Sequence, residues 1–458
     1  MSVKKVKYLI IGAGPTGLGA AHRLNELGES DFLVLDANDY AGGLAASFKD
    51  EQGFTWDVGG HVVFSHYPYF DELVDKLLRG EHLTHKRIAR VRSNGGWSPY
   101  PFQNNLRYLP HEVQWDCVAG LLPGKRPTAQ PANFAEWIMA GFGEGLARHF
   151  MYPYNFKVWA TPPELMAYAW IGERVSLVDL EGVLKNLILG EDNVTWGPNN
   201  MFRFPLRGGT GEIFRRLAQN LGERVRLGDG VILVDPDARR VRTRQSAEYQ
   251  YEYLLSTAPL DILILELMNR PESALRDAAK ELLHNGVLVA GIGVDGARED
   301  DTCWMYFPEN NCPFYRVTNF HNYSPNNVPA PGKQRALMAE ISFSAHKPED
   351  LPSLVQSTIT GLANTSLITP EEAQSRIASA WSFIADYGYP VPSLHRDRGL
   401  AVLQPWLEER RIYSRGRFGG WRYEVSNMDH SVMQGVEWAE RMVQGKAETT
   451  YRIPGVES

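Results

Sequence analysis

The chain has 458 residues, of which 43% are hydrophobic and 22% charged, and this balance is typical of a folded globular protein rather than a disordered or fibrous one. Its length predicts two or three domains. The formal net charge of −7 disfavours nucleic acid as a main partner, because phosphate binding normally requires a basic excess. The three cysteines form an odd, widely spaced set that matches neither a disulfide framework nor a zinc site, so we expect a cytoplasmic protein without a metal centre.

The first 36 residues predict a strand, a glycine turn, a helix and a second strand. The apolar run from Tyr8 to Ile11 is much shorter than a membrane-spanning helix, and no cleavage signature follows it. We therefore interpret it as the first strand and expect no membrane insertion. Apolar residues then recur on one face of the predicted helix: Ala20, Ala21, Leu24 and Leu27.

A glycine-rich turn joins this strand to this helix. Gly12 permits a tight turn, Gly14 lets the backbone approach a pyrophosphate, and Gly17 allows the helix to pack against the strand. Asp36 ends the second strand, near the spacing at which a carboxylate accepts hydrogen bonds from a ribose. A turn that merely joins strand to helix is the alternative, but strand, helix and acid together favour dinucleotide binding.

A second glycine pair follows the acid. Gly42, Gly43 and Leu44 would let the backbone run alongside a long, extended cofactor, and this favours FAD over NAD.

A histidine comes directly after a third glycine pair. In the segment Gly60, His61 and Val62, a ligand could approach the backbone closely with an imidazole beside it, which makes His61 the candidate flavin partner. From these residues alone, a loop histidine bonded to a nearby carbonyl is an equally good interpretation. For His66 we expect only such a structural role.

The rest of the chain predicts an α/β protein: a Rossmann-like FAD-binding domain with a helical insertion and a second, antiparallel β-sheet domain. Helices are predicted over Tyr69–Leu78, Phe134–Phe150, Leu180–Leu189 and Ser431–Val443, and strands within 224–256, 287–294 and 336–343. The predicted domains are residues 1–67, 205–260 and 400–458 for FAD, 68–204 as a mainly helical domain with a substrate flap, and 261–399 as the β-sheet substrate domain.

Aromatic residues make up 11% of the chain, and many stand next to amides or cations. Such groupings suit a ligand with a flat base, sugar hydroxyls and phosphates, and the planar guanidinium of Arg174 or Arg316 suits the phosphates best. Each aromatic alone is more often a core residue, and each arginine alone more often a surface ion pair. Motifs of metalloproteases, serine hydrolases and P-loop enzymes are absent, so the predicted flavin must carry the chemistry.

Several long blocks, in order, resemble the eukaryotic-type UDP-galactopyranose mutases, a family of flavin-dependent nucleotide-sugar mutases. The blocks are DVGGHVVFSHYPYFD, SPYPFQNN, YPYNFKVWA, WIGERV, WGPNNMFRFPLRGGTG, CWMYFPENNCPFYRVTNFHNYSP, YGYPVP and SRGRFGGWRYEVSNMDHS. The resemblance implies that N5 of a reduced FAD attacks the anomeric carbon of UDP-galactopyranose and expels UDP. The ring then opens to a flavin-sugar iminium and recloses as the furanose, without net oxidation.

The resemblance also implies roles for individual residues. Arg174 and Arg316 would hold the pyrophosphate, His61 would lie against the flavin ring and favour its reduced state, and Arg417 and Asn427 would face flavin and sugar. The predicted substrate contacts comprise hydroxyl donors to the pyrophosphate (Tyr306, Tyr323, Tyr389, Tyr423), uridine contacts (Tyr100, Gln103, Phe150, Asn155, Trp159), a flap residue (Asn199) and a border of the sugar pocket (Trp304).

The partners implied are a UDP-sugar and NADPH as the electron donor, in cell-wall or glycan biosynthesis, and the assembly is left open between a monomer and a homo-oligomer. Two alternatives stay open for the activity: the same chemistry on a 6-deoxy or N-acetylamino galactose nucleotide, or a flavin oxidase of the amine or protoporphyrinogen type. An oxidase should not need paired pyrophosphate arginines. A catalytically silent flavin- or UDP-sugar-binding protein is disfavoured because the histidine loop and both arginines are present.

Overall fold

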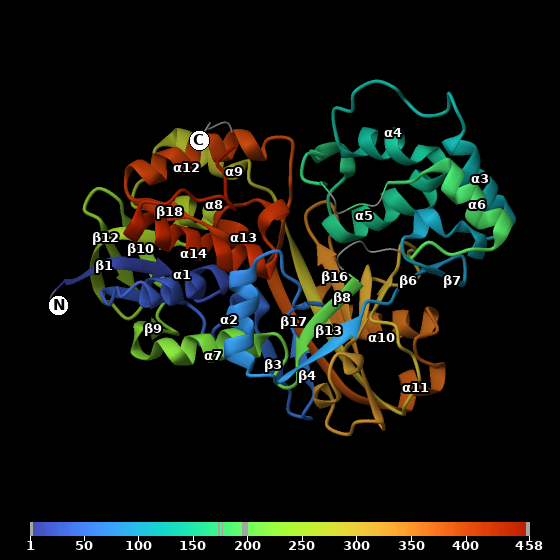
Figure 1. The fold of residues 1–458 in the computed structure, drawn as a ribbon, viewed down its shortest axis with the longest axis horizontal. Coiled ribbons are helices and arrows are strands. Elements are labelled where there is room, and N and C mark those ends of the chain that lie inside the picture. Colours follow the sequence, from blue (N-terminus) through green and yellow to red (C-terminus); the bar gives the residue numbers. More distant parts are fainter. Residues whose placement is uncertain (1–2, 173–174, 176, 195–199, 455–458) are drawn as a thin grey trace.

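The computed structural model describes residues 3–172, 175, 177–194 and 200–454. Two seven-stranded sheets organise this part of the chain. Figure 1 shows the first sheet and its helices on the left, the second sheet at the lower right and a helical region above it. Within the described residues, no helix is long and apolar enough to cross a membrane.

The first sheet has the order β10-β11-β12-β1-β2-β9, and β18 also pairs with β12. Pairing is parallel from β12 through β1 and β2 to β9, as the strand-turn-helix-strand prediction requires. The strands are β1 (Lys4–Ile11), β2 (Phe32–Leu35), β9 (Val225–Arg226), β10 (Val231–Asp235), β11 (Arg240–Thr243), β12 (Glu248–Ser256) and β18 (Ile412–Ser414).

Helices cover both faces of this sheet. Successive residues of β1 point to opposite faces, so Tyr8 and Ile10 enter one apolar core while Leu9 and Ile11 enter the other. The first core is formed with α1 (Pro15–Glu26), α2 (Pro68–Leu78), α7 (Gly211–Leu221) and α14 (Met428–Gln444). The second is formed with α8 (Leu260–Ile262), α9 (Ser273–Lys280) and α12 (Arg396–Glu409). The predicted C-terminal helix therefore packs on the first sheet beside α1.

The second sheet has the order β17-β13-β16-β15-β14-β6-β7 and is antiparallel except between β14 and β6. Its strands are β6 (Ala89–Ser93), β7 (Gly96–Pro99), β13 (His284–Asp295), β14 (Trp304–Tyr306), β15 (Arg316–Asn319), β16 (Gln334–Phe343) and β17 (Ile377–Pro390). One face packs on α10 (Leu354–Asn364), near α11 (Pro370–Ser375), and the other packs on aromatic side chains of β4 (Thr55–Asp57) and β8 (Met201–Pro205).

The segment predicted to be mainly helical contains a helical core and four strands. Its helices are α3 (His111–Leu121), α4 (Phe134–Leu146), α5 (Tyr152–Trp159) and α6 (Leu180–Leu189). Strands β6 and β7 join the second sheet through β14, and β5 (His82–Lys86) pairs with β8. Outside this segment, β3 (Ser47–Lys49) pairs with β4. The helix predicted to reach Phe150 ends at Leu146, and one π-helical turn, Ala147–Met151, connects it to α5.

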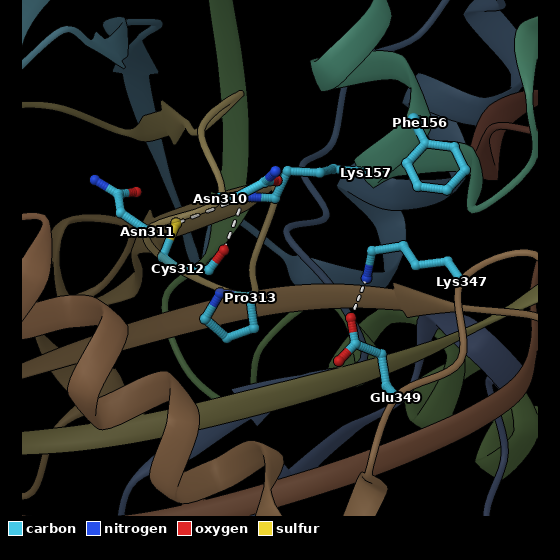
Figure 2. A pocket seen from close by; sticks show the side chains of 8 residues that line it. All are labelled: Phe156, Lys157, Asn310, Asn311, Cys312, Pro313, Lys347 and Glu349. Carbon is cyan, nitrogen blue, oxygen red and sulfur yellow. Dashed lines mark hydrogen bonds and ion pairs between the residues drawn. The ribbon is translucent and has the colours of Figure 1, made fainter.

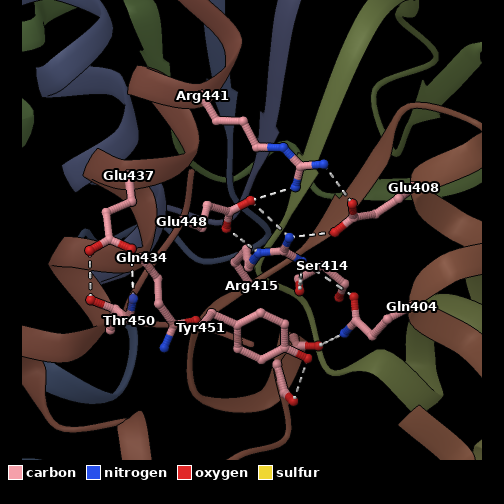
Figure 3. A network of polar contacts seen from close by, with 12 residues as sticks. Gln404, Glu408, Ser414, Arg415, Gln434, Glu437, Arg441, Glu448, Thr450 and Tyr451 are labelled. Atoms are coloured by element: carbon pink, nitrogen blue, oxygen red, sulfur yellow. Dashed lines mark hydrogen bonds and ion pairs between the residues drawn. The ribbon is translucent and has the colours of Figure 1, made fainter. Parts of the chain in front are cut away.

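A buried ion-pair network fastens the C-terminal segment to the first sheet (Figure 3). The Arg415 side chain is 2% exposed and donates hydrogen bonds to Glu448, at 2.6 and 3.0 Å, and to Glu408, at 2.5 Å. Arg441 binds the same two carboxylates from α14. Gly416, the next residue, begins α13 (Gly416–Gly419), which contains Arg417.

Candidate active site

The glycine turn between β1 and α1 leaves room for a ligand at one glycine and none at another. A Cβ atom added to Gly17 would overlap the carbonyl oxygen of Gly12, whereas a Cβ on Gly14 would have no protein atom within 4 Å. Gly14 precedes Pro15, the first residue of α1, so its open side faces the helix N-terminus, where backbone N–H groups favour phosphate. This cradle fits the pyrophosphate of FAD.

Asp36 supports the turn from the end of β2. Its carboxylate accepts hydrogen bonds from the backbone N–H of Ala13 at 2.5 Å and of Asn38 at 2.8 Å. Burial raises the pKa of Asp36, and these two hydrogen bonds oppose the rise. The carboxylate therefore already orders the turn, and its role toward a ribose stays a prediction.

The second glycine pair lies beside the same turn. The N–H of Gly42 donates to the carbonyl of Ala13 at 2.8 Å, and Gly43 and Leu44 begin a 3-10 turn. This contact places the two glycine segments side by side, as a long cofactor running across both would require.

The His61 loop, residues 58–67 between β4 and α2, lies against the second sheet. The N–H of Gly60 donates to Oε1 of Glu340 at 3.0 Å, and a Cβ on Gly60 would come within 2.8 Å of the Thr318 hydroxyl and 3.0 Å of the Trp304 indole nitrogen. Only glycine permits this approach. Burial lowers the pKa of His61 to about 4, against the opposing influence of Glu340, so the imidazole is neutral at pH 7.

Three residues form a row across neighbouring strands of the second sheet. Tyr306 of β14 lies opposite Arg316 of β15, which lies opposite Glu340 of β16. Arg316 donates two hydrogen bonds of 2.7 Å to Glu340, through Nε and Nη2. No described residue accepts a hydrogen bond from Nη1 of Arg316, so this nitrogen is available for a ligand oxygen. Glu340 thus connects the His61 loop to Arg316, whose Nη1 can donate to a ligand.

A tyrosine pair extends this row toward the helical region. The Tyr315 hydroxyl donates to Glu340 at 2.8 Å and lies 3.3 Å from the Tyr389 hydroxyl. Arg417 stacks on the rings of Tyr389 and Tyr423, with its guanidinium 4.9 and 5.7 Å from their centroids. Burial raises the pKa of Tyr315 and Tyr389, so both phenols stay protonated and can act as hydrogen-bond donors.

The predicted uridine residues gather in two aromatic groups. Tyr306 contacts the rings of Tyr100 and Tyr154, at centroid distances of 5.3 and 5.6 Å, and Phe150 stacks on Tyr154 at 5.2 Å. Trp159 contacts Tyr423 at 4.8 Å and Tyr389 at 5.7 Å. Of the two amides, Gln103 is buried, and Asn155 donates to the Met151 carbonyl at 2.8 Å.

Several buried polar atoms near the His61 loop make no hydrogen bond within the described part of the chain. They are Nδ1 of His61, Nε1 of Trp304, Oγ1 of Thr318 and the Tyr323 hydroxyl. Buried polar groups are normally paired, and each unpaired one costs about 1–3 kcal/mol. Their concentration beside a glycine loop fits a polar ligand bound there.

Of the remaining predicted residues, two lie in the described part of the chain and two lie outside it. Arg417 donates to the carbonyls of Gly388 and Ser426, which fixes its side chain between β17 and the start of α14. Asn427 is exposed and occupies the N-cap position of α14, where its side chain makes no capping hydrogen bond. Arg174 and Asn199 lie outside the described residues, so their roles stay predictions.

Sequence reasoning missed the residue at the centre of this arrangement. Glu340 is 2% exposed within the apolar strand β16, and its contacts join the His61 loop, Arg316 and Tyr315. The ion pair with Arg316 outweighs the effect of burial and holds the pKa of Glu340 below its usual value. A single carboxylate in the mostly apolar run Ala336–Phe343 was the available signal, because buried charges are normally paired. Thr318 was missed as well, and no local pattern marks it.

A surface cavity of about 350 Å³ lies apart from these residues (Figure 2). It is lined by Phe156, Lys157, Asn310, Asn311, Cys312, Pro313, Lys347 and Glu349. The Lys157 ammonium donates to the carbonyls of Glu309 and Cys312, so its charge fastens α5 to the loop before β15. None of the predicted site residues lines this cavity, and we do not assign the active site to it.

Comparison with known proteins decides the family. The model of flavin containing amine oxidoreductases matches residues 15–442, so the chain belongs to that family. A crystal structure of reduced UDP-galactopyranose mutase is similar with a TM-score of 0.93 and 43% sequence identity, covering 98% of this chain and 96% of that one. The chain belongs to the UDP-galactopyranose mutases. It is therefore a flavoprotein of the isomerase class, and the resemblance seen in the sequence is confirmed.

More distant relatives share the fold. Amine oxidase A from Sus scrofa is 25% identical over 339 residues, which cover 69% of this chain and 58% of the oxidase. A 15-cis-phytoene desaturase from Arabidopsis thaliana is 37% identical over 88 residues, or 19% of this chain and 15% of the desaturase. The match thus spans little more than half of the oxidase and about a seventh of the desaturase. A putative protoporphyrinogen oxidase from Exiguobacterium has a TM-score of 0.69 at 17% identity, over 97% of this chain and all of that one, which shows the fold alone.

Proposed function

We propose that this mutase converts UDP-galactopyranose to UDP-galactofuranose without net oxidation, with FAD in its reduced form. The similarity to a reduced UDP-galactopyranose mutase over nearly the whole chain carries the proposal. Reduced flavin, when bound, supplies a nucleophilic nitrogen for the anomeric carbon of the sugar. The protein's task is then to bind, orient and shield the reacting groups.

The residues of the glycine turn would bind the cofactor. The open side of Gly14 at the N-terminus of α1 suits the FAD pyrophosphate, and the neutral His61 can hydrogen-bond to the flavin without adding charge. Asn427, at the N-cap position of α14, would face the flavin and the sugar. NADPH is the proposed electron donor.

Arg316 and the tyrosines would stabilise the leaving UDP. Nη1 of Arg316 can donate to a pyrophosphate oxygen while Glu340 keeps the guanidinium oriented. Protonated hydroxyls of Tyr306, Tyr389 and Tyr323 would add neutral donors, and Arg174 a second cation. Such preorganised donors stabilise developing negative charge more than water does.

The deciding experiment incubates the purified, FAD-loaded protein with UDP-galactopyranose in the presence and absence of dithionite and separates the nucleotide sugars. We expect UDP-galactofuranose only with the reductant. Absence of a furanose product under reducing conditions would refute the proposal for this sugar. Parallel reactions with 6-deoxy and N-acetylamino galactose nucleotides then identify the preferred substrate.

A further inference from the structure

Two histidines and a carboxylate converge at the end of the His61 loop although 363 residues separate His66 from Asp429. His66 lies near the end of this loop, just before α2, while Asp429 and His430 belong to the first turn of α14. Nδ1 of His66 is 2.8 Å from Oδ2 of Asp429, and Nδ1 of His430 is 3.1 Å from Oδ1. One ligand atom from each residue lies within 4.8 Å of the other two.

The geometry is close to that of a metal site. Zn²⁺ binds imidazole nitrogen and carboxylate oxygen at about 2.0–2.2 Å, and tetrahedral coordination then separates neighbouring ligand atoms by about 3.3 Å. The distances of 2.8 and 3.1 Å end on different oxygens of Asp429, and one ligand atom from each residue lies within 4.8 Å of the others, so rotations of the carboxylate and of the half-exposed His66 ring would bring all three onto one ion. Two imidazoles and one carboxylate are a ligand set suited to Zn²⁺ and related divalent transition metals.

The carboxylate is held in place, and one side of the cluster is accessible. Asp429 is 1% exposed, and the backbone N–H of His66 donates to its Oδ2 at 3.1 Å. The His66 side chain is 50% exposed, whereas that of His430 is 12% exposed. An ion could therefore enter from solvent past His66 and keep water as its fourth ligand, as open zinc sites do.

We propose that His66, Asp429 and His430 bind one divalent transition-metal ion, with Zn²⁺ the best fit, and that the ion ties the His61 loop to α14. The ion has no part in the isomerisation proposed above. It would act on the loop that faces the flavin, because His66 is five residues beyond His61 in the same connection between β4 and α2.

Zinc binding is tested by calorimetric titration of the FAD-loaded, tag-free protein with ZnCl₂ after chelator treatment. We expect one Zn²⁺ per chain, and binding at least about tenfold weaker in each of the variants His66→Ala and His430→Ala. His149→Ala is the matched control, because His149 lies 3.0 Å from Asp116 at the surface and belongs to no such three-residue cluster among the described residues. It should bind Zn²⁺ as the wild type does.

Failure of the wild type to bind one Zn²⁺, unchanged binding in His66→Ala and His430→Ala, or an equal loss in His149→Ala would each overturn the site. Flavin absorbance checks that the variants remain folded. Hydrogen exchange tests the tie: Zn²⁺ should slow exchange in residues 58–67 of the wild type but not of His66→Ala. Bound Zn²⁺ with unchanged exchange in the loop would refute the tie.

Discussion

Arg316 and Glu340 lie directly opposite each other on β15 and β16 and are joined by two hydrogen bonds of 2.7 Å. Glu340 also accepts the N–H of Gly60, so one carboxylate holds both the His61 loop and the arginine proposed to bind pyrophosphate. Loop position and arginine orientation are therefore physically linked. The strands that carry Tyr306, Arg316 and Glu340 follow one another in the chain and pair in that order, whereas the loop comes from a segment 280 residues away from Glu340.

Replacing Glu340 tests this link. Glu340→Gln leaves the buried side of Arg316 without a counter-charge, and we expect the free energy of unfolding to fall by about 3 kcal/mol. Because a bound pyrophosphate would restore the missing negative charge, UDP should raise the melting temperature of this variant more than that of the wild type. Tyr315→Phe, which removes one hydrogen bond to the same carboxylate, should cost only about 1 kcal/mol. Equal UDP-induced shifts in Glu340→Gln and wild type would contradict the link.

Two alanine substitutions separate cofactor binding from folding. In Gly14→Ala the added methyl group meets no protein atom, so the apoprotein should keep its stability within about 1 kcal/mol but bind FAD more weakly. In Gly17→Ala it meets the Gly12 carbonyl, and we expect the apoprotein itself to lose about 1–3 kcal/mol. Flavin absorbance and denaturant unfolding measure both. Normal FAD affinity in Gly14→Ala would argue against the proposed pyrophosphate position.

The buried His61 should make stability depend on pH. Its pKa is about 4 in the folded protein and about 6.5 when unfolded, so the unfolded chain binds more protons between these values. The contribution is complete above pH 6.5 and is lost as the pH falls toward 4, by no more than about 1.4 kcal/mol per pH unit. FAD-saturated His61→Gln should show a correspondingly smaller slope in urea unfolding between pH 7 and pH 5. An identical slope in both proteins would show that His61 titrates normally.

Removing either proposed pyrophosphate arginine should weaken UDP binding. For Arg316→Ala and Arg174→Ala we expect a loss of about 1.5–3 kcal/mol each, the range for a charge-assisted hydrogen bond. Titration calorimetry with the reduced enzyme measures the loss. Arg203→Ala provides a control, since this arginine pairs with Asp71 and Asp75 of α2. UDP affinity that stays the same in both test variants refutes the assignment.

The C-terminal ion-pair network should contribute to stability independently of the active site. Arg415→Ala leaves Glu448 and Glu408 without their most buried partner, and we expect the free energy of unfolding to fall by about 3–5 kcal/mol. Arg410→Ala, at the exposed end of the same region, should cost less than about 1 kcal/mol. Similar losses in the two variants would show that the buried network stabilises the fold no more than an exposed ion pair does.

The local elements could be predicted from the sequence. The helix predicted at Leu180–Leu189 has those bounds, the strand predicted at Ala336–Phe343 lies within β16, and the glycine turn joins β1 to α1. These predictions succeeded because apolar periodicity and glycine spacing depend on neighbours within a few residues. The family blocks could likewise be recognised from the residues alone, whereas the domain boundaries and the individual site roles remain predictions.

Contacts between distant segments were decided by the tertiary structure. Glu340 contacts Gly60 although 280 residues separate them. Strand β6, which lies in a segment whose sequence favoured helices, pairs with β14 of the second sheet. His66 meets Asp429 only because α14 packs on the first sheet beside the loop. A linear pattern carries no information about which buried charge will find which partner, since that choice depends on the packing of whole sheets and helices. The sequence by itself determined the glycine turn and the family resemblance, and the folded chain decided that the loop, the arginine and the carboxylate come together.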